Sequence, residues 1–191
     1  MQLDNRGTAP AGFRTETFIA EPLTVSNAQL EYECYMASPD VIRIHSDGRW
    51  PVTGFSLADD ITMAAAHEID HQAGRSLAYV LLTPSRNQAL GCLYLNPFPV
   101  LNPLPDQVPS ITAVVTFWIR QDRQYTDLPR QVAEKVNRWI LDGLPLGGHV
   151  FRVLPTEDSS CSALDAIGCR AIDLDVPGEE RPYLWFASST S

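Results

Sequence analysis

The pentapeptide HEIDH at residues 67–71 is the part of the sequence whose residue types and spacing most directly suggest chemistry. It fits HExxH, a pattern in which two histidines bind zinc and the glutamate between them transfers protons. His67 and His71 are four residues apart, so on a helix they share one face, with Glu68 beside the first of them. The pattern therefore raises a zinc hydrolase as one hypothesis.

The remainder of the sequence does not complete a zinc site. In the longer metzincin pattern a third histidine stands where this chain has Leu77, and no methionine follows Met63 to form the Met-turn. The gluzincin pattern needs a glutamate on a later helix, and the first glutamate after the motif, Glu134, lies in a segment with an apolar stripe. We expect no metal in this protein.

The segment that carries HEIDH also has a helical hydrophobic pattern. Apolar residues recur at every fourth position: Leu57, Ile61, Ala65 and Ile69. This spacing predicts that these residues face the core. His67, Asp70 and His71 then lie on the opposite side, and we interpret that side as a solvated polar face.

Composition limits the classes of partner. The chain has 191 residues, 45% of them hydrophobic, and a net charge of -9, which indicates a single globular domain. The negative charge disfavours nucleic acid and anionic membranes as partners. The four cysteines have no CxxC spacing and are predicted to be free thiols, mostly buried.

The N-terminal region shows no targeting signal. Residues 1–15 are predicted to form a flexible leader, and residues 16–191 to form the domain. There is no apolar signal-peptide region and no apolar run long enough to span a membrane, so we expect a cytoplasmic protein without a membrane partner. A homodimer remains an open alternative.

Capping residues, glycines and prolines mark the ends of the predicted helices and strands. The order of these elements predicts an α/β (α+β) domain with a mixed, mostly antiparallel sheet flanked by helices. Capping boxes are predicted at Ser26 with Gln29 and at Ser56 with Asp59, and a stiff proline-rich connection at 96–110. The predicted elements are strands at 17–23, 76–84, 89–97, 111–120, 149–155, 171–176 and 183–188, and helices at 26–38, 56–74, 127–143 and 158–170.

This order resembles the GNAT superfamily of N-acetyltransferases over roughly residues 16–187. The local matches are "LGCLYL" on the third strand, "VVTFWIR" on the fourth, and "SSCSALDAIGCR" on the last helix. The resemblance implies binding of acetyl-CoA or another acyl-CoA in a cleft beside the fourth strand. It assigns cofactor contacts to Phe117, Trp118, Ile119 and Gln124.

The sequence departs from the family at two places. The family's pyrophosphate loop corresponds to "QYTDLP" at 124–129, where Asp127 and Pro129 replace glycines. Proline has no N–H to offer a phosphate, and we expect the Asp127 carboxylate to cap the following helix and repel the anion. Leu164 stands where the family often has a tyrosine acid, so the catalytic residues are not assigned from the sequence.

Three functional hypotheses follow. The first is an acyl-CoA-dependent N-acyltransferase acting on a small-molecule amine or a peptide, with Trp50 and Phe55 in the loop "GRWPVTGF" lining the acceptor side. The second is a catalytically silent member of the fold that serves as a binding or oligomerisation module, which the "QYTDLP" loop favours. The third is the zinc hydrolase, which depends on HEIDH alone.

Overall fold

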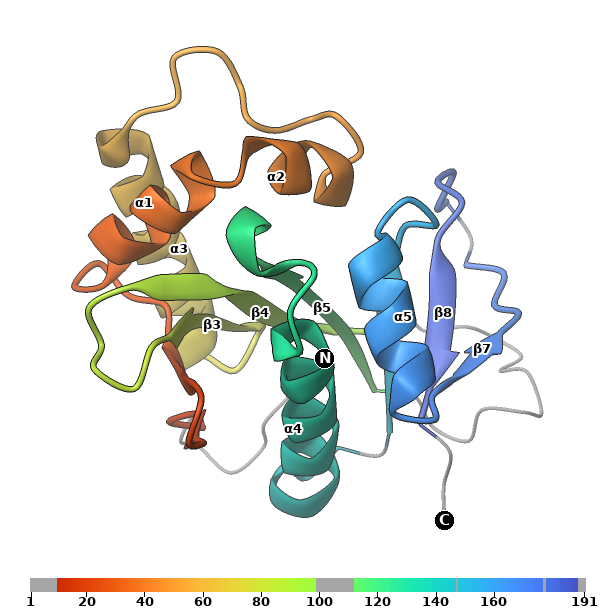
Figure 1. The fold of residues 1–191 in the computed structure, drawn as a ribbon. Helices are drawn as coiled ribbons and strands as arrows, with labels where there is room; N and C mark the ends of the chain where they lie inside the picture. The colour runs from red at the N-terminus through yellow and green to blue at the C-terminus, as the bar shows by residue number, and fades with distance from the viewer. Residues whose placement is uncertain (1–9, 99–111, 147, 177, 189–191) are drawn as a thin grey trace.

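The computed structural model describes residues 10–98, 112–146, 148–176 and 178–188, which form one α/β domain (Figure 1). The helices are α1 (Ala28–Met36), α2 (Pro39–His45), α3 (Leu57–Gln72), α4 (Leu128–Gly143) and α5 (Asp158–Ala166), with a 3-10 turn, η1, at Gln121–Arg123. The strands are β1 (Phe13–Arg14), β2 (Ile19–Pro22), β3 (Leu77–Leu82), β4 (Ala89–Pro97), β5 (Ala113–Ile119), β6 (His149–Val153), β7 (Arg170–Ile172) and β8 (Leu184–Ala187).

All eight strands belong to one sheet, in the order β1-β2-β3-β4-β5-β6-β8-β7. The pair β5–β6 is parallel and every other pair is antiparallel, so the predicted mixed, mostly antiparallel sheet is confirmed. Most of the predicted proline-rich connection, from residue 99 on, lies outside the described residues, as do residues 1–9 of the predicted leader.

Two elements were not predicted from the sequence. Phe13–Arg14 pairs with β2, so the sheet begins inside the segment predicted as a leader. Pro39, interpreted as the end of the preceding helix, is instead the first residue of α2. A proline fits there because the first helical N–H has no intrahelical partner to lose.

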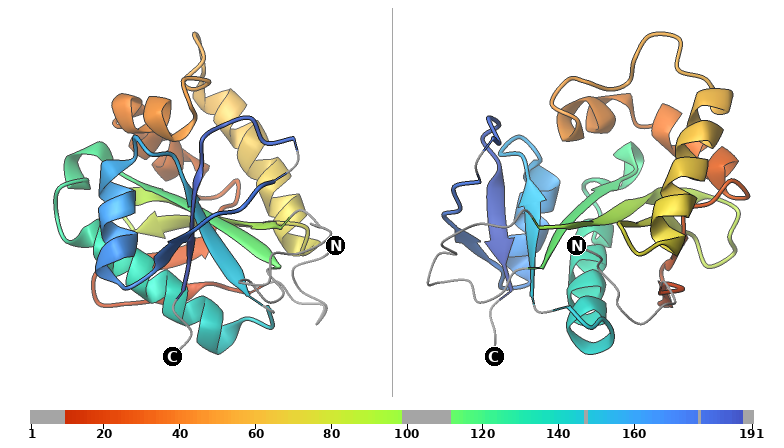
Figure 2. Two further views of the ribbon diagram at one scale, coloured as in Figure 1. Left: turned by 90° about the vertical axis from the view of Figure 1, so that its right-hand side faces the viewer. Right: turned by 180° about the vertical axis from the view of Figure 1, so that it is seen from behind.

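The helices cover both faces of the sheet (Figures 1 and 2). Side chains alternate along β3: Leu77, Tyr79 and Leu81 pack in a cluster with α4 and α5, while the intervening side chains pack with α1 and α3. The stripe predicted on α4 is confirmed, with its three aliphatic members buried and its tryptophan partly buried against the same cluster: Val132, Val136, Ile140 and Trp139.

The predicted core face of α3 is wrong. Ile69 is 60% exposed and Ile61 is also exposed, whereas Asp60, Ala64 and His71 are buried. The helix is therefore rotated so that its polar side faces the protein. A hydrophobic pattern cannot reveal this orientation, because the groups that bond these polar side chains come from distant parts of the chain.

The two predicted helix caps have different outcomes. Ser56 and Asp59 form the predicted capping box at the start of α3. The box predicted at Ser26 and Gln29 is wrong, because α1 starts one residue later behind Asn27. Asn27 instead accepts a hydrogen bond from the Thr24 N–H, which shapes the turn before the helix.

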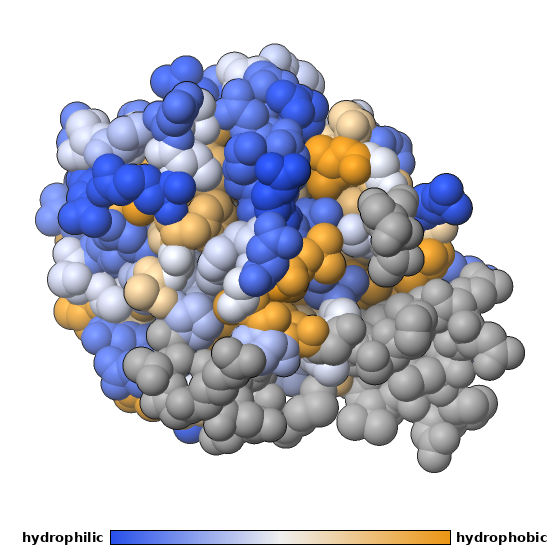
Figure 3. Space-filling view, turned by 90° about the horizontal axis from the view of Figure 1, so that it is seen from below, coloured by the Kyte–Doolittle hydropathy of each residue, from blue (hydrophilic) through white to orange (hydrophobic). Residues whose placement is uncertain are grey.

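Hydrophilic residues occupy much of the drawn face seen from below, with hydrophobic residues showing between them (Figure 3). Cys34, Cys92 and Cys169 are buried and free, as predicted. In the described parts of the chain, none of the helices has the length and apolar character needed to cross a membrane.

Candidate functional site

The parallel strands β5 and β6 separate part-way along their length. They pair from Ala113 with His149 to Val115 with Phe151, and no further pairing joins them among the described residues. Beyond that point the ladder opens into a wedge between the second half of β5 and the segment that leads from β6 into α5. The wedge lies beside β5, the strand next to which the family resemblance implied a cleft.

The backbone of β5 presents hydrogen-bonding groups to this wedge. The Arg120 N–H donates to the Leu90 carbonyl at 2.8 Å, on the β4 side of the sheet. Because successive residues of a strand direct their backbone groups to opposite sides, those of Phe117 and Ile119 point toward β6. Of the predicted contacts on β5, Phe117 and Ile119 therefore direct their backbone groups to the opening, whereas Trp118 directs its own toward β4.

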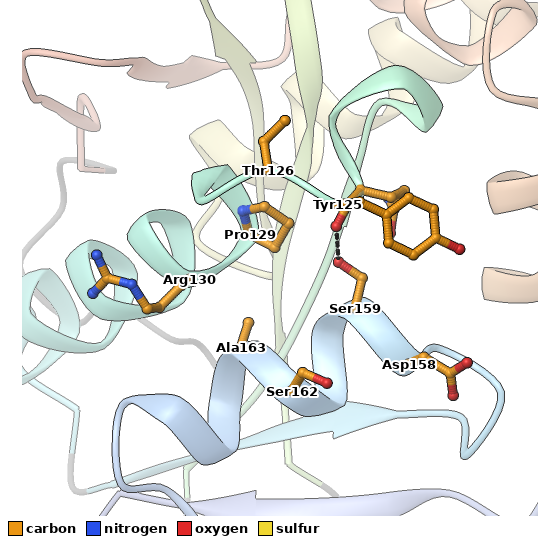
Figure 4. A pocket seen from close by; sticks show the side chains of 9 residues that line it. Tyr125, Thr126, Pro129, Arg130, Asp158, Ser159, Ser162 and Ala163 are labelled. Carbon is orange, nitrogen blue, oxygen red and sulfur yellow. Dashed lines mark hydrogen bonds between the residues drawn. The ribbon is translucent and has the colours of Figure 1, made fainter.

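The Gln124 side chain occupies one of these backbone groups, since its amide donates a hydrogen bond to the Ile119 carbonyl. The Gln124 carbonyl in turn accepts a 2.6 Å hydrogen bond from the Ser159 hydroxyl of α5. Figure 4 shows this contact, with the start of α5 facing the segment before α4. A cavity of about 290 Å³ lies there, and Arg130 is among its lining residues.

The segment before α4 is not a phosphate cradle of the glycine-rich type. The Leu128 N–H bonds the Thr126 hydroxyl at 3.3 Å, and Pro129 has no N–H. Asp127 does not cap the helix as predicted, for within the described structure its carboxylate makes no cap hydrogen bond. It accepts hydrogen bonds from the Arg130 and Gln131 side chains instead, which lower its pKa to about 2.

The positive charge of Arg130 is therefore already balanced by carboxylates. Its guanidinium bonds Asp127 at 2.7 Å and Glu134 at 3.1 Å. Two carboxylates thus surround the cation nearest the helix N-terminus. An incoming diphosphate would have to displace them, so the residues present do not form the anion site usual in this fold.

A histidine–carboxylate pair stands at the mouth of the wedge. His45 Nδ1 and Glu157 Oε1 are 2.6 Å apart, and their side chains are 21% and 8% exposed. Glu157 also accepts a 2.6 Å hydrogen bond from the Leu154 N–H, which orients the carboxylate. His45 Nε2 has no hydrogen-bond partner among the residues that the structure describes, so this nitrogen is available to accept a proton.

The position of His45 depends on how α2 is anchored. The Asp40 N–H donates to the Gln121 side-chain oxygen at 3.1 Å, and the Gln121 amide donates to the Asp40 carboxylate at 3.1 Å. This reciprocal pair ties the start of α2 to η1, directly after β5. Residues 45 and 157 are far apart in the chain, and no sequence pattern marks either of them as functional.

A second cavity, of about 140 Å³, lies beside the wedge and is lined by α1, α2, α3 and the β4–β5 surface. The predicted acceptor-side residues Trp50 and Phe55 both line it, with their ring centroids 5.2 Å apart. Tyr35 packs against Phe55 at 5.2 Å. His45 and Trp118 also line this cavity, so it adjoins the separation of the strands.

Two buried acids face this aromatic cavity. Glu31 and Asp60 are each 5% exposed. Burial, followed by the charge of Asp60, raises the pKa of Glu31 to about 9. Burial also raises the pKa of Asp60. Like-charged carboxyls in a site of low polarity cannot both ionise readily, so the pair retains a proton near neutral pH.

HEIDH contributes no metal site to this arrangement. Both ring nitrogens of His71 lie 3.2 Å from carbonyl oxygens, those of Ala78 and Pro10. His67 packs against Tyr94, and Glu68 accepts a hydrogen bond from the Val25 N–H at 3.2 Å. Among the described residues, no group of three or more His, Cys, Asp or Glu side chains is arranged to hold a metal ion.

The last helix has no acid at the position examined in the sequence. Leu164 is fully buried in the α4–α5 cluster and carries no transferable proton. The candidates for proton transfer at the wedge are instead His45 of α2 and Glu157, the residue directly before α5. A glutamate directly before a helix and a single histidine in a short helix are both common in proteins, so their sequence spacing does not mark them as functional.

No protein-family model matches this sequence, and no curated protein is significantly similar to it. Solved structures do match. A ribosomal-protein-S5-alanine acetyltransferase from Vibrio fischeri aligns with a TM-score of 0.72 and 12% identity, over 94% of this chain and 96% of that chain. RimL, a ribosomal L7/L12 α-N-protein acetyltransferase in complex with coenzyme A, aligns with a TM-score of 0.69 and 13% identity, over 94% and 96%. The microcin C7 self-immunity acetyltransferase MccE, in complex with acetyl-CoA and AMP, aligns with a TM-score of 0.69 and 12% identity, over 96% and 99%.

These likenesses extend over nearly the whole of each chain. The protein therefore has the GNAT acetyltransferase fold, which confirms the resemblance drawn from "LGCLYL" and "VVTFWIR" at the level of fold. The sequence identities are too low to transfer the substrates of those enzymes to this chain.

Proposed function

We propose that this protein is an N-acyltransferase that moves an acetyl or longer acyl group from an acyl-CoA to an amine. The observation that carries the proposal is the wedge between β5 and β6 in a chain with the GNAT fold. Such a wedge leaves strand backbone unpaired inside a domain, which is unfavourable unless a ligand or water satisfies it.

The wedge suits the pantetheine arm of the donor. The arm's amides need backbone donors and acceptors, and the Phe117 and Ile119 groups that face β6 would supply them. Gln124 would have to release the Ile119 carbonyl or share it. Trp118, on the opposite face of β5, lies between the wedge and the aromatic cavity and would separate the two substrates.

The diphosphate end of coenzyme A fits less well. Pro129 has no N–H to donate to a phosphate, and Arg130 is already ion-paired with Asp127. We infer that the thioester arm contributes most of the donor's affinity. RimL and MccE were solved with coenzyme A or acetyl-CoA bound, and this supports the same donor class here.

The proton chemistry is assigned to His45 and Glu157. When bound, acyl-CoA supplies a thioester carbonyl that an amine can attack. His45 Nε2 would accept the proton of the attacking amine, while Glu157 holds the ring through Nδ1 and stabilises the imidazolium. The Phe117 and Ile119 N–H groups are the donors available to polarise the carbonyl.

Trp50 and Phe55 are proposed to bind the acceptor, because they line the cavity that His45 shares with the wedge. RimL is an α-N-protein acetyltransferase, so a peptide N-terminus is one candidate acceptor and a small amine is the other. His45 and Trp118 of β5 both line this cavity, so an amine bound there would lie near both.

A ligand panel tests the proposal. Acetyl-CoA, a longer acyl-CoA and desulfo-CoA would be added to the full-length protein, and the melting temperature and amine-dependent thiol release would be measured. A ligand that binds the folded state raises the melting temperature by mass action, so at least one of the three should do so.

The second candidate, a catalytically silent binding module, is favoured by the neutralised segment before α4. It predicts no melting-temperature shift with any of these ligands and no thiol release with any amine. That result would overturn the transferase proposal.

A further inference from the structure

The aromatic cavity contains polar atoms that the protein itself leaves unsatisfied. The Tyr35 hydroxyl is buried and has no hydrogen-bond partner among the described residues, and the buried Asp60 carboxyl has only another acid, Glu31, as its partner. Both residues line the same cavity. A buried hydroxyl without a partner costs free energy, and beside a pair of buried acids it indicates that something else bonds these groups.

The ionisable side chains that line the cavity are also mainly acidic. Glu31 and Asp60 line it together, whereas none of the described residues that line it is Lys or Arg. The only basic side chain there, His45, is held by Glu157. With the proton that the pair retains, one negative charge stays buried without a counter-ion, so the cavity lacks a cation that its own lining does not supply.

Aromatic rings form much of the remaining wall. Trp50, Phe55, Tyr94 and Trp118 line the cavity with Tyr35. Ring faces attract cations, and they do so more strongly where water is excluded. The wall thus favours the same ligand charge as the two acids.

We propose that this cavity binds the primary ammonium group of the amine acceptor, with Asp60, Glu31 and Tyr35 as its binding residues. A primary ammonium brings three N–H donors, which the Asp60 carboxylate and the Tyr35 hydroxyl can accept. A quaternary ammonium satisfies the rings but donates no hydrogen bond, so it is the poorer ligand.

This assignment rests on the proposed transferase function and narrows its acceptor class. An ammonium held by the ionised carboxylate of this pair stays protonated and is not a nucleophile. The acceptor therefore carries a second amine, which reaches His45 and reacts there. Compact diamines and peptides with two nearby amino groups fit this description, whereas neutral and anionic acceptors do not.

Binding of simple ammonium salts to the full-length protein, without any acyl-CoA, tests the inference. The probes are n-propylammonium, 1,4-diaminobutane, tetramethylammonium and 1-propanol at matched ionic strength, measured by calorimetric titration and thermal shift. The two primary ammonium probes should bind, and tetramethylammonium and 1-propanol should bind at least tenfold more weakly. Equal binding of all four, or of none, overturns the inference.

Variants locate the binding. Asp60→Asn keeps the shape of the side chain and should weaken 1,4-diaminobutane at least tenfold, and Tyr35→Phe should weaken it severalfold. Glu33→Gln, an exposed acid on the same helix as Glu31, is the matched control and should leave the affinity unchanged. Binding that survives both Asp60→Asn and Tyr35→Phe would place the ammonium elsewhere and overturn the assignment.

The outcome is separable from that of the transferase proposal. Because the ammonium titration contains no donor, failure of ammonium binding leaves the acyl-CoA panel unaffected. Conversely, ammonium binding that depends on Asp60, together with no response to any acyl-CoA, supports the cation site and removes the transferase.

Discussion

The Ser159 hydroxyl donates a 2.6 Å hydrogen bond to the main-chain carbonyl of Gln124, and this bond joins α5 to the segment that leads into α4. The Gln124 side chain continues the connection to the Ile119 carbonyl of β5. The two sides of the wedge are thus linked near its open end by side-chain contacts instead of by a strand ladder. Several measurable consequences follow from this and from the buried charges around the wedge.

Ser159→Ala removes the connection between α5 and Gln124. Because a typical intramolecular hydrogen bond is worth about 1 kcal/mol net, the free energy of unfolding should fall by about that amount in urea denaturation. Ser162→Ala, at an exposed position on the same helix, is the control and should change it by less than about 0.5 kcal/mol. Equal effects of the two changes would mean that the Ser159 bond contributes nothing.

His45→Gln should lower kcat by about 10²- to 10⁴-fold, the usual contribution of a general base, with a smaller effect on KM. Steady-state kinetics with the amine identified by the ligand panel would measure it. Glu157 is a positioning residue in this scheme. Glu157→Gln removes the carboxylate that holds Nδ1 and should lower kcat with little change in KM. A lower melting temperature with unchanged kcat would assign Glu157 a purely structural role.

Glu31→Gln should stabilise the protein at alkaline pH. The pKa of Glu31 is about 9 in the folded protein and 4.5 without the fold, so between these values the folded chain keeps a proton that the unfolded chain loses. Stability of the wild type therefore falls as pH rises through this range. The variant has no such proton, and its advantage should grow from pH 5 to pH 9, reaching on the order of 1 kcal/mol or more. Denaturation curves at several pH values, with Glu33→Gln as control, would show the trend or its absence.

His149 should make the protein sensitive to acid. Burial lowers its pKa from 6.5 to about 4, so the unfolded chain takes up a proton below pH 6.5 that the folded chain refuses until about pH 4. The stability associated with neutral His149 is fully present above pH 6.5 and is lost as pH falls toward 4, by up to about 3 kcal/mol. His149→Gln should flatten the stability curve over this interval and leave its slope above pH 7 unchanged. An identical slope in both proteins would contradict the assignment.

Gly91→Ala should severely destabilise the sheet at the wedge. Gly91 has a φ of +146°, and an added Cβ would lie 2.0 Å from the Trp118 carbonyl oxygen on β5. The backbone of β5 would have to move, at a cost of about 3 kcal/mol or more, comparable to severe core overpacking. Gly143→Ala, where the nearest atom is 3.6 Å away, is the matched control and should be neutral or stabilising. Thermal melts of the two variants distinguish a close approach from a general intolerance of alanine.

Elements with a strong local pattern could be predicted from the sequence. The strands predicted at 76–84, 89–97 and 111–120 and the helix predicted at 127–143 correspond to β3, β4, β5 and α4. The helix α2 was missed because it is short, and because a proline can end one helix or begin the next with the same local sequence.

The site could be predicted only in part. Phe117 and Ile119 lie at the opening of the wedge, as the family resemblance implied, and Trp50 and Phe55 share a cavity. Their roles in binding remain proposals. Sequence spacing carried no signal for the pair of His45 with Glu157, because these residues are 112 positions apart and are brought together by packing.

The sequence by itself determined most of the strands and helices, and through their order the fold, because those choices depend on contacts within a few residues; β1 and α2 were the exceptions. The tertiary structure alone decided which side of α3 is buried. Its apolar residues at 61 and 69 point outward, while His71 reaches the carbonyl groups of Ala78 and Pro10 and Asp60 approaches Glu31. Those partners come from other elements, and the free energy of satisfying buried polar groups outweighed the local hydrophobic pattern.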